Sequence, residues 1–159
     1  MNRLKKLRNH IDMELNGMEN PEKRISADAH LYGVSLAAVI LAGKRGLDPE
    51  LAAMAGMLHD LHAYRSGSYD DHARKGAELA EQILKELGLT DQEETKIICS
   101  AISHHDDKHS VDAPMDELLK DADVIHHCMN DPSKPVKGKE KKRFAQICAE
   151  LGLSYRNLS

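Results

Sequence analysis

Ten histidines in 159 residues make imidazole the most unusual feature of this sequence. The stretch MLHDLH, Met57 to His62, places two histidines around an aspartate within an otherwise apolar segment. A buried polar group without a partner costs roughly 1–3 kcal/mol, so such residues are expensive inside a core. Neutral imidazole nitrogens and carboxylate oxygens are, however, good ligands for divalent metal ions. The stretch therefore indicates a metal site, if other segments supply further ligands.

Other histidines lie on apolar faces of the predicted helices. Residues at i, i+3, i+4 and i+7 share one helix face. By this criterion four histidines face inward from four different segments: His30, His59, His72 and His105. A single histidine on such a face is usually a hydrogen-bonded core residue. Four of them, together with Asp60, favour a metal site over coincidence.

A late acidic residue would complete this site. The segment LLKDADVIHH carries Asp121 and Asp123, which flank the apolar stripe of its predicted helix about equally. Periodicity does not choose between them, and an exposed helix-surface aspartate is the alternative for each. His59 and Asp60 project about 100° apart on a helix, so both can reach one ion. Small side chains share the face of His59 and would let neighbouring helices approach closely.

The elements that must position these residues are helices. Period-2 alternation and Asn-Gly hairpin signals are missing from the sequence. Helical periodicity, the N-cap pair Asp48-Pro49 and the C-terminal Gly88 divide the chain into helices. We expect them at residues 2–16, 27–45, 48–64, 70–88, 91–106, 114–129 and 139–151. The expected fold is all-α: one bundle of about six to seven helices over residues 1–159.

Within this single domain we expect a core at about residues 25–130. An N-terminal helix within 1–20 precedes it, and a loop with a C-terminal helix at 131–159 follows. A chain of 159 residues can bury a sizeable core as one domain. Residues Lys134 to Arg143 are strongly basic, and a solvated loop and helix start is favoured there over a phosphate-binding patch.

Composition excludes several classes of protein. The net charge of -4 argues against a general nucleic-acid binder. The start MNRLKKLRNH is too polar for a signal peptide, and no apolar run reaches about 18 residues, so we expect a cytoplasmic protein without a membrane span. Three cysteines without CxxC spacing indicate neither a disulfide framework nor a structural zinc knuckle.

In chain order the candidate ligands form one series: His30, His59-Asp60, His72, His104-His105 and Asp123. This series resembles the HD-domain superfamily of metal-dependent phosphohydrolases, over about residues 25–130. A His-Asp pair alone is a weak signal, whereas the whole series on successive predicted helices is strong. The resemblance implies a helical bundle in which one metal ion is held by His30, His59, Asp60 and Asp123. The late aspartate of the family usually follows a small residue, which favours Asp123 over Asp121.

Members with extra histidines hold two metal ions, bridged by the aspartate of the pair. His72 and the pair His104-His105 match those extra positions, so the resemblance suggests a binuclear site bridged by Asp60. The expected cofactor is one or two divalent ions, among Fe, Mn, Ni, Co, Zn and Mg. His104 also shares its face with Ser100 and Asp107, and orienting a ligand or substrate is the alternative role for it.

Some branches of the superfamily fit less well. The cyclic-di-nucleotide phosphodiesterases carry a GYP signature, which is missing after the HHDD stretch, and a lysine where Ala63 stands. Some members place a glutamate where Ser26 stands, which disfavours a third metal ion. The small stand-alone bacterial hydrolases are the closest match.

The resemblance implies hydrolysis of a nucleotide or related small phosphoester by metal-activated water, with Asp60 holding the nucleophile in line. His62 is a candidate proton donor or phosphate contact, and Arg65, Lys75 and Lys108 are candidates for contacting substrate phosphate. The simpler alternative for these four is a rim or solvated position. Three further histidines are expected to be peripheral, although His126 lies one turn from Asp123: His109, His126 and His127.

A second class of function remains open. In that alternative the metal cluster is not catalytic, and it staples the helices together or senses metal or ligand. A structural site surrounds its ions with protein ligands, whereas a catalytic site leaves positions for water. The expected partner is a small phosphoester or nucleotide, and the oligomeric state is open.

Overall fold

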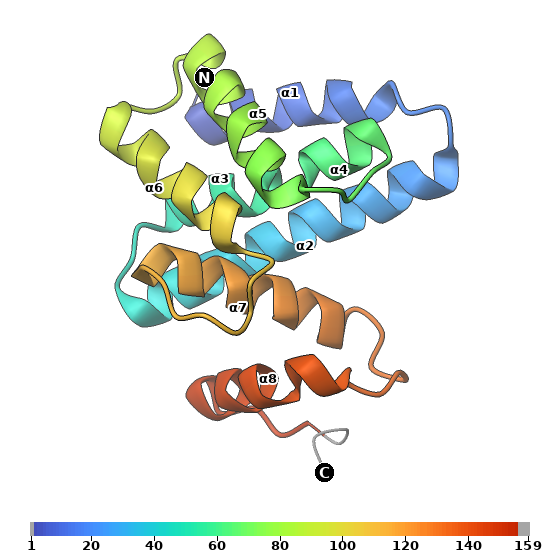
Figure 1. The fold of residues 1–159 in the computed structure, drawn as a ribbon, viewed down its shortest axis with the longest axis vertical. Helices are drawn as coiled ribbons and strands as arrows, with labels where there is room; N and C mark the ends of the chain where they lie inside the picture. The colour runs from blue at the N-terminus through green and yellow to red at the C-terminus, as the bar shows by residue number, and fades with distance from the viewer. Residues whose placement is uncertain (1, 156–159) are drawn as a thin grey trace.

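A computed structural model describes residues 2–155, which form helices and, within that range, no strand (Figure 1). The helices are α1 Arg3–Asn16, α2 Pro21–Arg45, α3 Pro49–Leu58, α4 Leu61–Ser66, α5 His72–Leu87, α6 Gln92–His104, α7 Pro114–Met129 and α8 Gly138–Leu151. The all-α expectation is confirmed.

Two helix boundaries differ from expectation. The helix predicted at 48–64 is two helices, α3 and α4, because the backbone leaves helical geometry at Asp60 (φ -112°, ψ 7°). This break raises the number of helices in the described residues to eight. Helix α2 begins at Pro21, six residues before the predicted start, because Asn20 caps it by accepting hydrogen bonds from the backbone N–H groups of Glu22 and Lys23.

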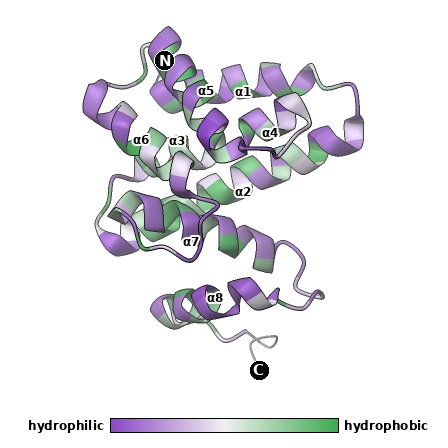
Figure 2. Ribbon diagram, in the orientation of Figure 1, coloured by the Kyte–Doolittle hydropathy of each residue, from purple (hydrophilic) through white to green (hydrophobic). Residues whose placement is uncertain are grey.

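Helix α2 is the central element of the bundle. Its most extensive contacts are with α3 and α7, while α5 and α6 form an antiparallel pair that packs on α3 and α7 through α6 (Figure 1). Apolar segments face this interior and polar segments face outward (Figure 2). Helix α8 packs against α7, where a smaller apolar cluster surrounds the buried Phe144. The main core and this second cluster meet at α7.

Helix α2 also has the composition of a possible membrane span. Its 25 residues contain an 18-residue window with a mean hydropathy of 1.5. Half of that window is buried inside the bundle, as is usual for the central helix of a helical domain. The expectation of no membrane span stays a prediction.

Close contact between α2 and α3 depends on one glycine. A Cβ atom at Gly56 would lie 2.5 Å from the Cα atom of Ser35, which is far inside van der Waals contact. Ser35 also donates a hydrogen bond from Oγ to the carbonyl of Ala53 at 3.0 Å. The two helices therefore touch backbone to backbone, three residues before His59.

Loop 106–113, between α6 and α7, is held by a buried lysine. Lys120 is fully buried, and its Nζ donates to the carbonyl of Ser110 at 2.8 Å and to the carboxylate of Asp112 at 2.6 Å. Glu117 lies 2.9 Å from the same ammonium group. A charge buried in this way is stable only with such partners, so α7 fixes the loop that follows His105.

Replacement of Gly56 tests the close helix contact. We expect Gly56→Ala to lower the free energy of unfolding by about 1–3 kcal/mol, because α2 and α3 must separate. Gly43→Ala is the matched control: its Cβ would meet nothing within 4 Å, and alanine in a helix should add about 0.5–1 kcal/mol. Urea unfolding followed by circular dichroism measures both, and equal stability of the two variants would contradict the packing.

Candidate metal centre

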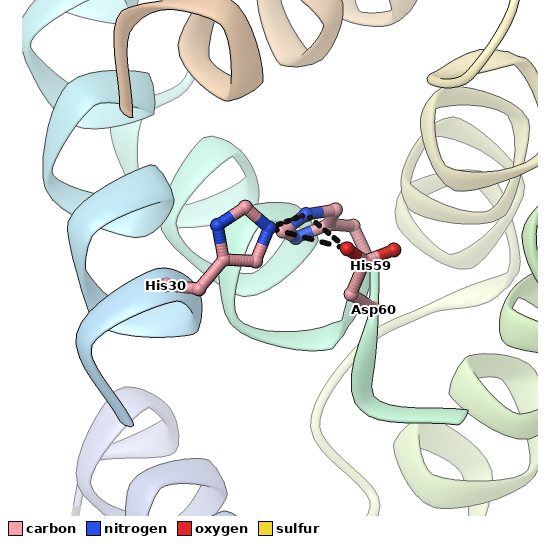
Figure 3. Close-up of side chains that lie close together, drawn as sticks. All are labelled: His30, His59 and Asp60. Carbon is pink, nitrogen blue, oxygen red and sulfur yellow. Dashed lines mark hydrogen bonds and ion pairs between the residues drawn. The ribbon is translucent and has the colours of Figure 1, made fainter. Parts of the chain in front are cut away.

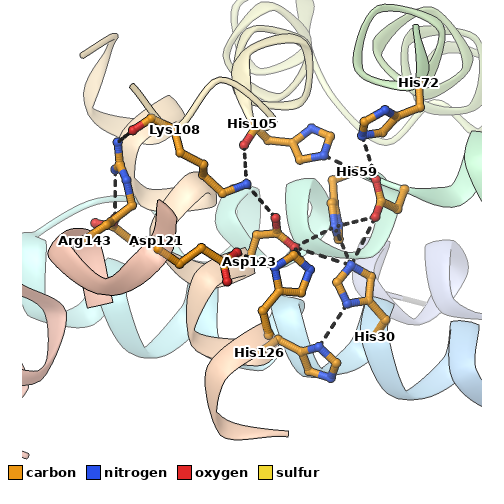
Figure 4. A network of polar contacts seen from close by, with 12 residues as sticks. His30, His59, His72, His105, Lys108, Asp121, Asp123, His126 and Arg143 are labelled. Carbon is orange, nitrogen blue, oxygen red and sulfur yellow. Dashed lines mark hydrogen bonds and ion pairs between the residues drawn. The ribbon is translucent and has the colours of Figure 1, made fainter. Parts of the chain in front are cut away.

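The predicted ligands come from five different places in the bundle. His30 lies in the middle of α2, and Asp123 lies in α7. His59 and Asp60 occupy the break between α3 and α4, His72 begins α5, and His105 directly follows α6. Figure 4 shows the side chains of the four histidines and Asp123 turned toward one another. The break after α3 allows two adjacent side chains to enter the same cluster.

One group of atoms gathers around the Oδ2 atom of Asp60. The Nε2 atom of His30 lies 3.1 Å from this oxygen and 3.0 Å from the Nε2 atom of His59 (Figure 3). The Oδ1 atom of Asp123 lies 3.4 Å from the same atom of His30 and 3.6 Å from that of His59. These four residues form the set that the sequence resemblance implied for one ion.

A second group faces the other oxygen of Asp60. The Nε2 atom of His105 lies 3.3 Å from Oδ1, and that of His72 lies 3.6 Å from it. Asp60, His72 and His105 together have the spacing of a metal-binding group. The two oxygens of one carboxylate thus face two separate pairs of histidines.

Backbone carbonyls orient three of these rings. The Nδ1–H groups of His59 and His105 donate to the carbonyls of Gly56 and Ile102, each at 2.7 Å, and that of His72 donates to the carbonyl of Tyr69 at 3.0 Å. Since a carbonyl can only accept, the proton of a neutral ring stays on Nδ1. The Nε2 lone pairs of His72 and His105 therefore point toward Asp60.

Lone pairs that face a carboxylate repel it unless positive charge lies between them. The Oδ1 atoms of Asp60 and Asp123 are buried and have no hydrogen-bond partner. Divalent cations would satisfy these oxygens and the ring nitrogens at once. The donor set of this cluster therefore fits the metal ions that the resemblance implied.

The electrostatics of the cluster agree with this interpretation. Burial raises the pKa of Asp60, but the charge of His59 and hydrogen bonds from neighbouring histidines outweigh burial and hold that pKa well below its usual range. Burial lowers the pKa of His59, but Asp60 and Asp123 outweigh burial and raise it to about 10. Without an ion, a proton on His59 thus supplies the positive charge that the carboxylates require.

His104 is not brought to the cluster. It is the last residue of α6, its side chain is 46% exposed, and its Nδ1 atom lies 2.9 Å from the buried carboxylate of Asp116. Adjacent residues at a helix end point in different directions, so only His105 turns inward. The structure therefore brings His105 to the cluster but not His104, although both were expected there.

Asp121 and Asp123 lie on different faces of α7. Asp121 accepts hydrogen bonds from Arg45 at 2.6 Å and from Arg143 at 2.9 Å, away from the histidines (Figure 4). Asp123 faces His30 and His59. The structure thus brings Asp123 to the cluster, as the resemblance favoured.

Three residues expected to act on substrate lie elsewhere. His62, Arg65 and Lys75 line a separate shallow hollow between α4 and α5. The expected position of His62, one turn beyond His59, required a continuous helix, and the break at Asp60 redirects it. Lys75 instead donates from Nζ to the carbonyl of Asp70 at 3.1 Å.

Lys108 does lie beside the cluster. Its Nζ donates to the Oδ2 atom of Asp123 and to the carbonyl of His105, each at 2.7 Å. Of the four residues expected to act on substrate, Lys108 is the one that the structure places beside the cluster.

Two histidines that were expected to be peripheral, His126 and His127, lie beside the cluster. The Nδ1 atom of His126 lies 2.9 Å from that of His30, while the Nε2 atom of His127 lies 3.3 Å from the Oδ1 atom of Asp123. The Nδ1 atom of His127 lies 2.8 Å from Oε1 of Glu140, which is only 3% exposed. The spacing of three and four residues after Asp123 was the available signal.

The cluster lies in a cleft of about 1000 Å³. Ile25, Ala29, Tyr64 and Tyr69 line it on α2, α4 and the turn after α4. His109 and several lysines also line it: Lys108, Lys134, Lys137 and Lys139. A small molecule with an apolar part and an anionic part would match this lining.

The helical bundle and the order of its histidines and aspartates are those that the HD-domain resemblance implied. Residues 27–128 match the model of the HD domain family. The chain belongs to this family. The match covers every residue of the two atom groups around Asp60.

Two relatives and one solved structure are similar to the chain. YueE of Bacillus subtilis (strain 168), provisionally named a phosphohydrolase, is 31% identical over 140 residues, which cover 73% of this chain and 79% of YueE. Ribonuclease Y of Chlorobium luteolum (strain DSM 273 / BCRC 81028 / 2530) is 29% identical over 96 residues, 60% of this chain but 17% of that protein. The crystal structure of a predicted HD superfamily hydrolase from an uncultured Thermotogales bacterium has a TM-score of 0.66 at 21% identity, covering 95% of this chain and 90% of that one, and supports the fold.

Metal retention separates His59 from His104. We expect His59→Ala to lose bound divalent metal after gel filtration, because the Nε2 atom of His59 faces both carboxylates. His104→Ala should retain the wild-type metal content, because its ring contacts Asp116 instead. Elemental analysis by mass spectrometry measures the content, and equal losses in both variants would contradict the geometry.

The two aspartates of α7 should have opposite phenotypes. Asp123→Asn should lower the metal content and leave the fold intact. Asp121→Asn should retain metal but lower the free energy of unfolding by about 1–3 kcal/mol, because it weakens a partly buried ion-pair network with Arg45 and Arg143. Metal analysis and urea unfolding of both variants test this, and metal loss in Asp121→Asn would count against the assignment.

Proposed function

We propose that this protein is a metal-dependent phosphohydrolase that cleaves a nucleotide or a related small phosphoester at a binuclear site. Membership of the HD family and the likeness to a provisionally named phosphohydrolase support the reaction class. The observation that carries the proposal is the position of Asp60, whose two oxygens face two separate pairs of histidines.

In this proposal six residues hold the ions. His30, His59 and Asp123 would hold one with Oδ2 of Asp60, and His72 and His105 would hold the other with Oδ1. Divalent cations at such a site neutralise charge on phosphate oxygens and lower the pKa of water toward neutrality. Fe, Mn, Co, Ni, Zn and Mg all suit parts of this donor set, and availability would decide among them.

The remaining residues of the cleft would bind and orient the substrate. Lys108 presents a mostly buried ammonium group beside Asp123 and would donate to a phosphate oxygen. Its Nζ is held at the cluster by the carbonyl of His105, so the charge is already in place. Tyr64 and Tyr69 line the cleft and offer ring surface for an organic leaving group.

The number of proposed ligand atoms favours a catalytic metal site over a purely structural one. The proposed ligands supply seven atoms, since Asp60 contributes both oxygens. Two six-coordinate ions would leave about five positions for water or substrate. The adjoining cleft gives these positions access to a small molecule, whereas a structural site would be closed.

Turnover by metal-loaded variants tests this function. Purified protein with Mn²⁺ should hydrolyse p-nitrophenyl phosphate or members of a nucleotide panel. His105→Ala should lower kcat/KM by at least about 100-fold and reduce the metal content by half, because several kcal/mol of charge stabilisation are lost. Lys75→Gln is the control that should retain wild-type activity, because this residue lies outside the cleft.

Two results would count against the proposal. Tight retention of two ions without turnover on any phosphoester would favour the non-catalytic module. An unchanged metal content in His105→Ala would reject the binuclear arrangement, whatever the activity.

A further inference from the structure

The C-terminal segment beyond the family match contributes to the cleft. The HD match ends at residue 128, yet five residues of the segment 129–151 line the cleft: Asn130, Lys134, Lys137, Lys139 and Glu140. The first three precede α8, and the other two lie in its first turn. One wall of the cleft is therefore made by residues outside the matched domain.

Helix α8 is held firmly in this position. Phe144 and Ile147 are buried against α7. Arg143 donates to Glu117 and Asp121 on α7, each at 2.9 Å, and from its Nη2 atom to the carbonyl of Lys108 at 3.0 Å. The wall thus has a defined place next to both α7 and loop 106–113.

A buried contact connects α8 to the metal cluster. Glu140 accepts a hydrogen bond from the Nδ1 atom of His127, and the Nε2 atom of the same ring lies 3.3 Å from the Oδ1 atom of Asp123. The pKa of His127 is raised by its hydrogen bond to Glu140. The first turn of α8 therefore lies one imidazole ring away from a proposed metal ligand.

Two lysines beside this contact have no acidic partner. Within residues 2–155, neither Lys137 nor Lys139 forms an ion pair, although both line the cleft. Two acidic residues that line the same cleft are already engaged with other partners: Glu140 with His127, and Asp123 with Lys108. Two lysines without an ion-pair partner thus remain on this wall.

We propose that Lys137 and Lys139 form a second anion subsite, which binds a phosphate group of the substrate other than the one that is hydrolysed. This inference rests on the proposed function of the metal cluster. The substrate class is then a small phosphoester with at least two phosphate groups. The cleft of about 1000 Å³ suits such a small molecule, and the net charge of -4 disfavours a long polyanion.

Binding of matched ligands tests the subsite without requiring turnover. AMP carries one phosphate, whereas ADP and adenosine 3′,5′-bisphosphate carry a second one on the same nucleoside. Isothermal titration of the Mn²⁺-loaded protein, with free Mn²⁺ held constant, should show at least about tenfold tighter binding of one of the two-phosphate ligands, as charge-assisted contacts predict.

The variant and its control separate the subsite from general charge. Lys137→Gln/Lys139→Gln should reduce the two-phosphate advantage to less than about threefold and leave AMP binding unchanged. Lys141→Gln/Lys142→Gln removes the same charge from exposed positions of α8 that do not line the cleft. This control should keep the wild-type preference, and circular dichroism should show both variants folded.

Each outcome decides the inference. An equal affinity for all three ligands, or an equal loss in both double variants, would overturn the subsite. So would tighter binding of a ten-nucleotide RNA than of either two-phosphate ligand, since the partner would then be a nucleic acid. Turnover without a two-phosphate preference rejects the subsite alone, whereas a preference without turnover upholds the subsite and rejects the hydrolase.

Discussion

The structure depends on compensating the charge of two buried carboxylates. Asp60 and Asp123 each keep one oxygen without a hydrogen-bond partner, among histidines whose free nitrogens cannot all donate. Backbone carbonyls hold three of those rings by Nδ1, so the side chains cannot rotate to relieve the repulsion. Cations satisfy this arrangement, and few other groups would.

The bundle is arranged to bring these ligands together. A glycine at position 56 lets α3 touch the backbone of α2, and the chain breaks at Asp60 so that two adjacent side chains reach the same point. A glycine at position 33 has a related role, because a Cβ there would lie 2.3 Å from the ring of His126. The two glycines thus allow α3 and the ring of His126 to lie closer to α2 than a larger residue would permit.

The sequence predicted most helices and most of the cluster, for identifiable reasons. Apolar periodicity located the helix at 114–129, and the ordered histidines indicated the residues that gather around Asp60. The break at Asp60 was missed because Leu58 and Leu61 continue the apolar pattern across it. The inward turn of His105 rather than His104 depends on where α6 ends, and the contact between His127 and Glu140 depends on how α8 docks, which no local pattern encodes.

Lys108 leaves one oxygen of Asp123 free to face the histidines. Its ammonium group occupies Oδ2 of Asp123, whereas the oxygen that faces the histidines is Oδ1. The ammonium group of Lys108 and a metal ion therefore need not compete for the same oxygen atom. Because Lys108 already holds the carboxylate of Asp123, a cation bound at Oδ1 would require little rearrangement of this side chain.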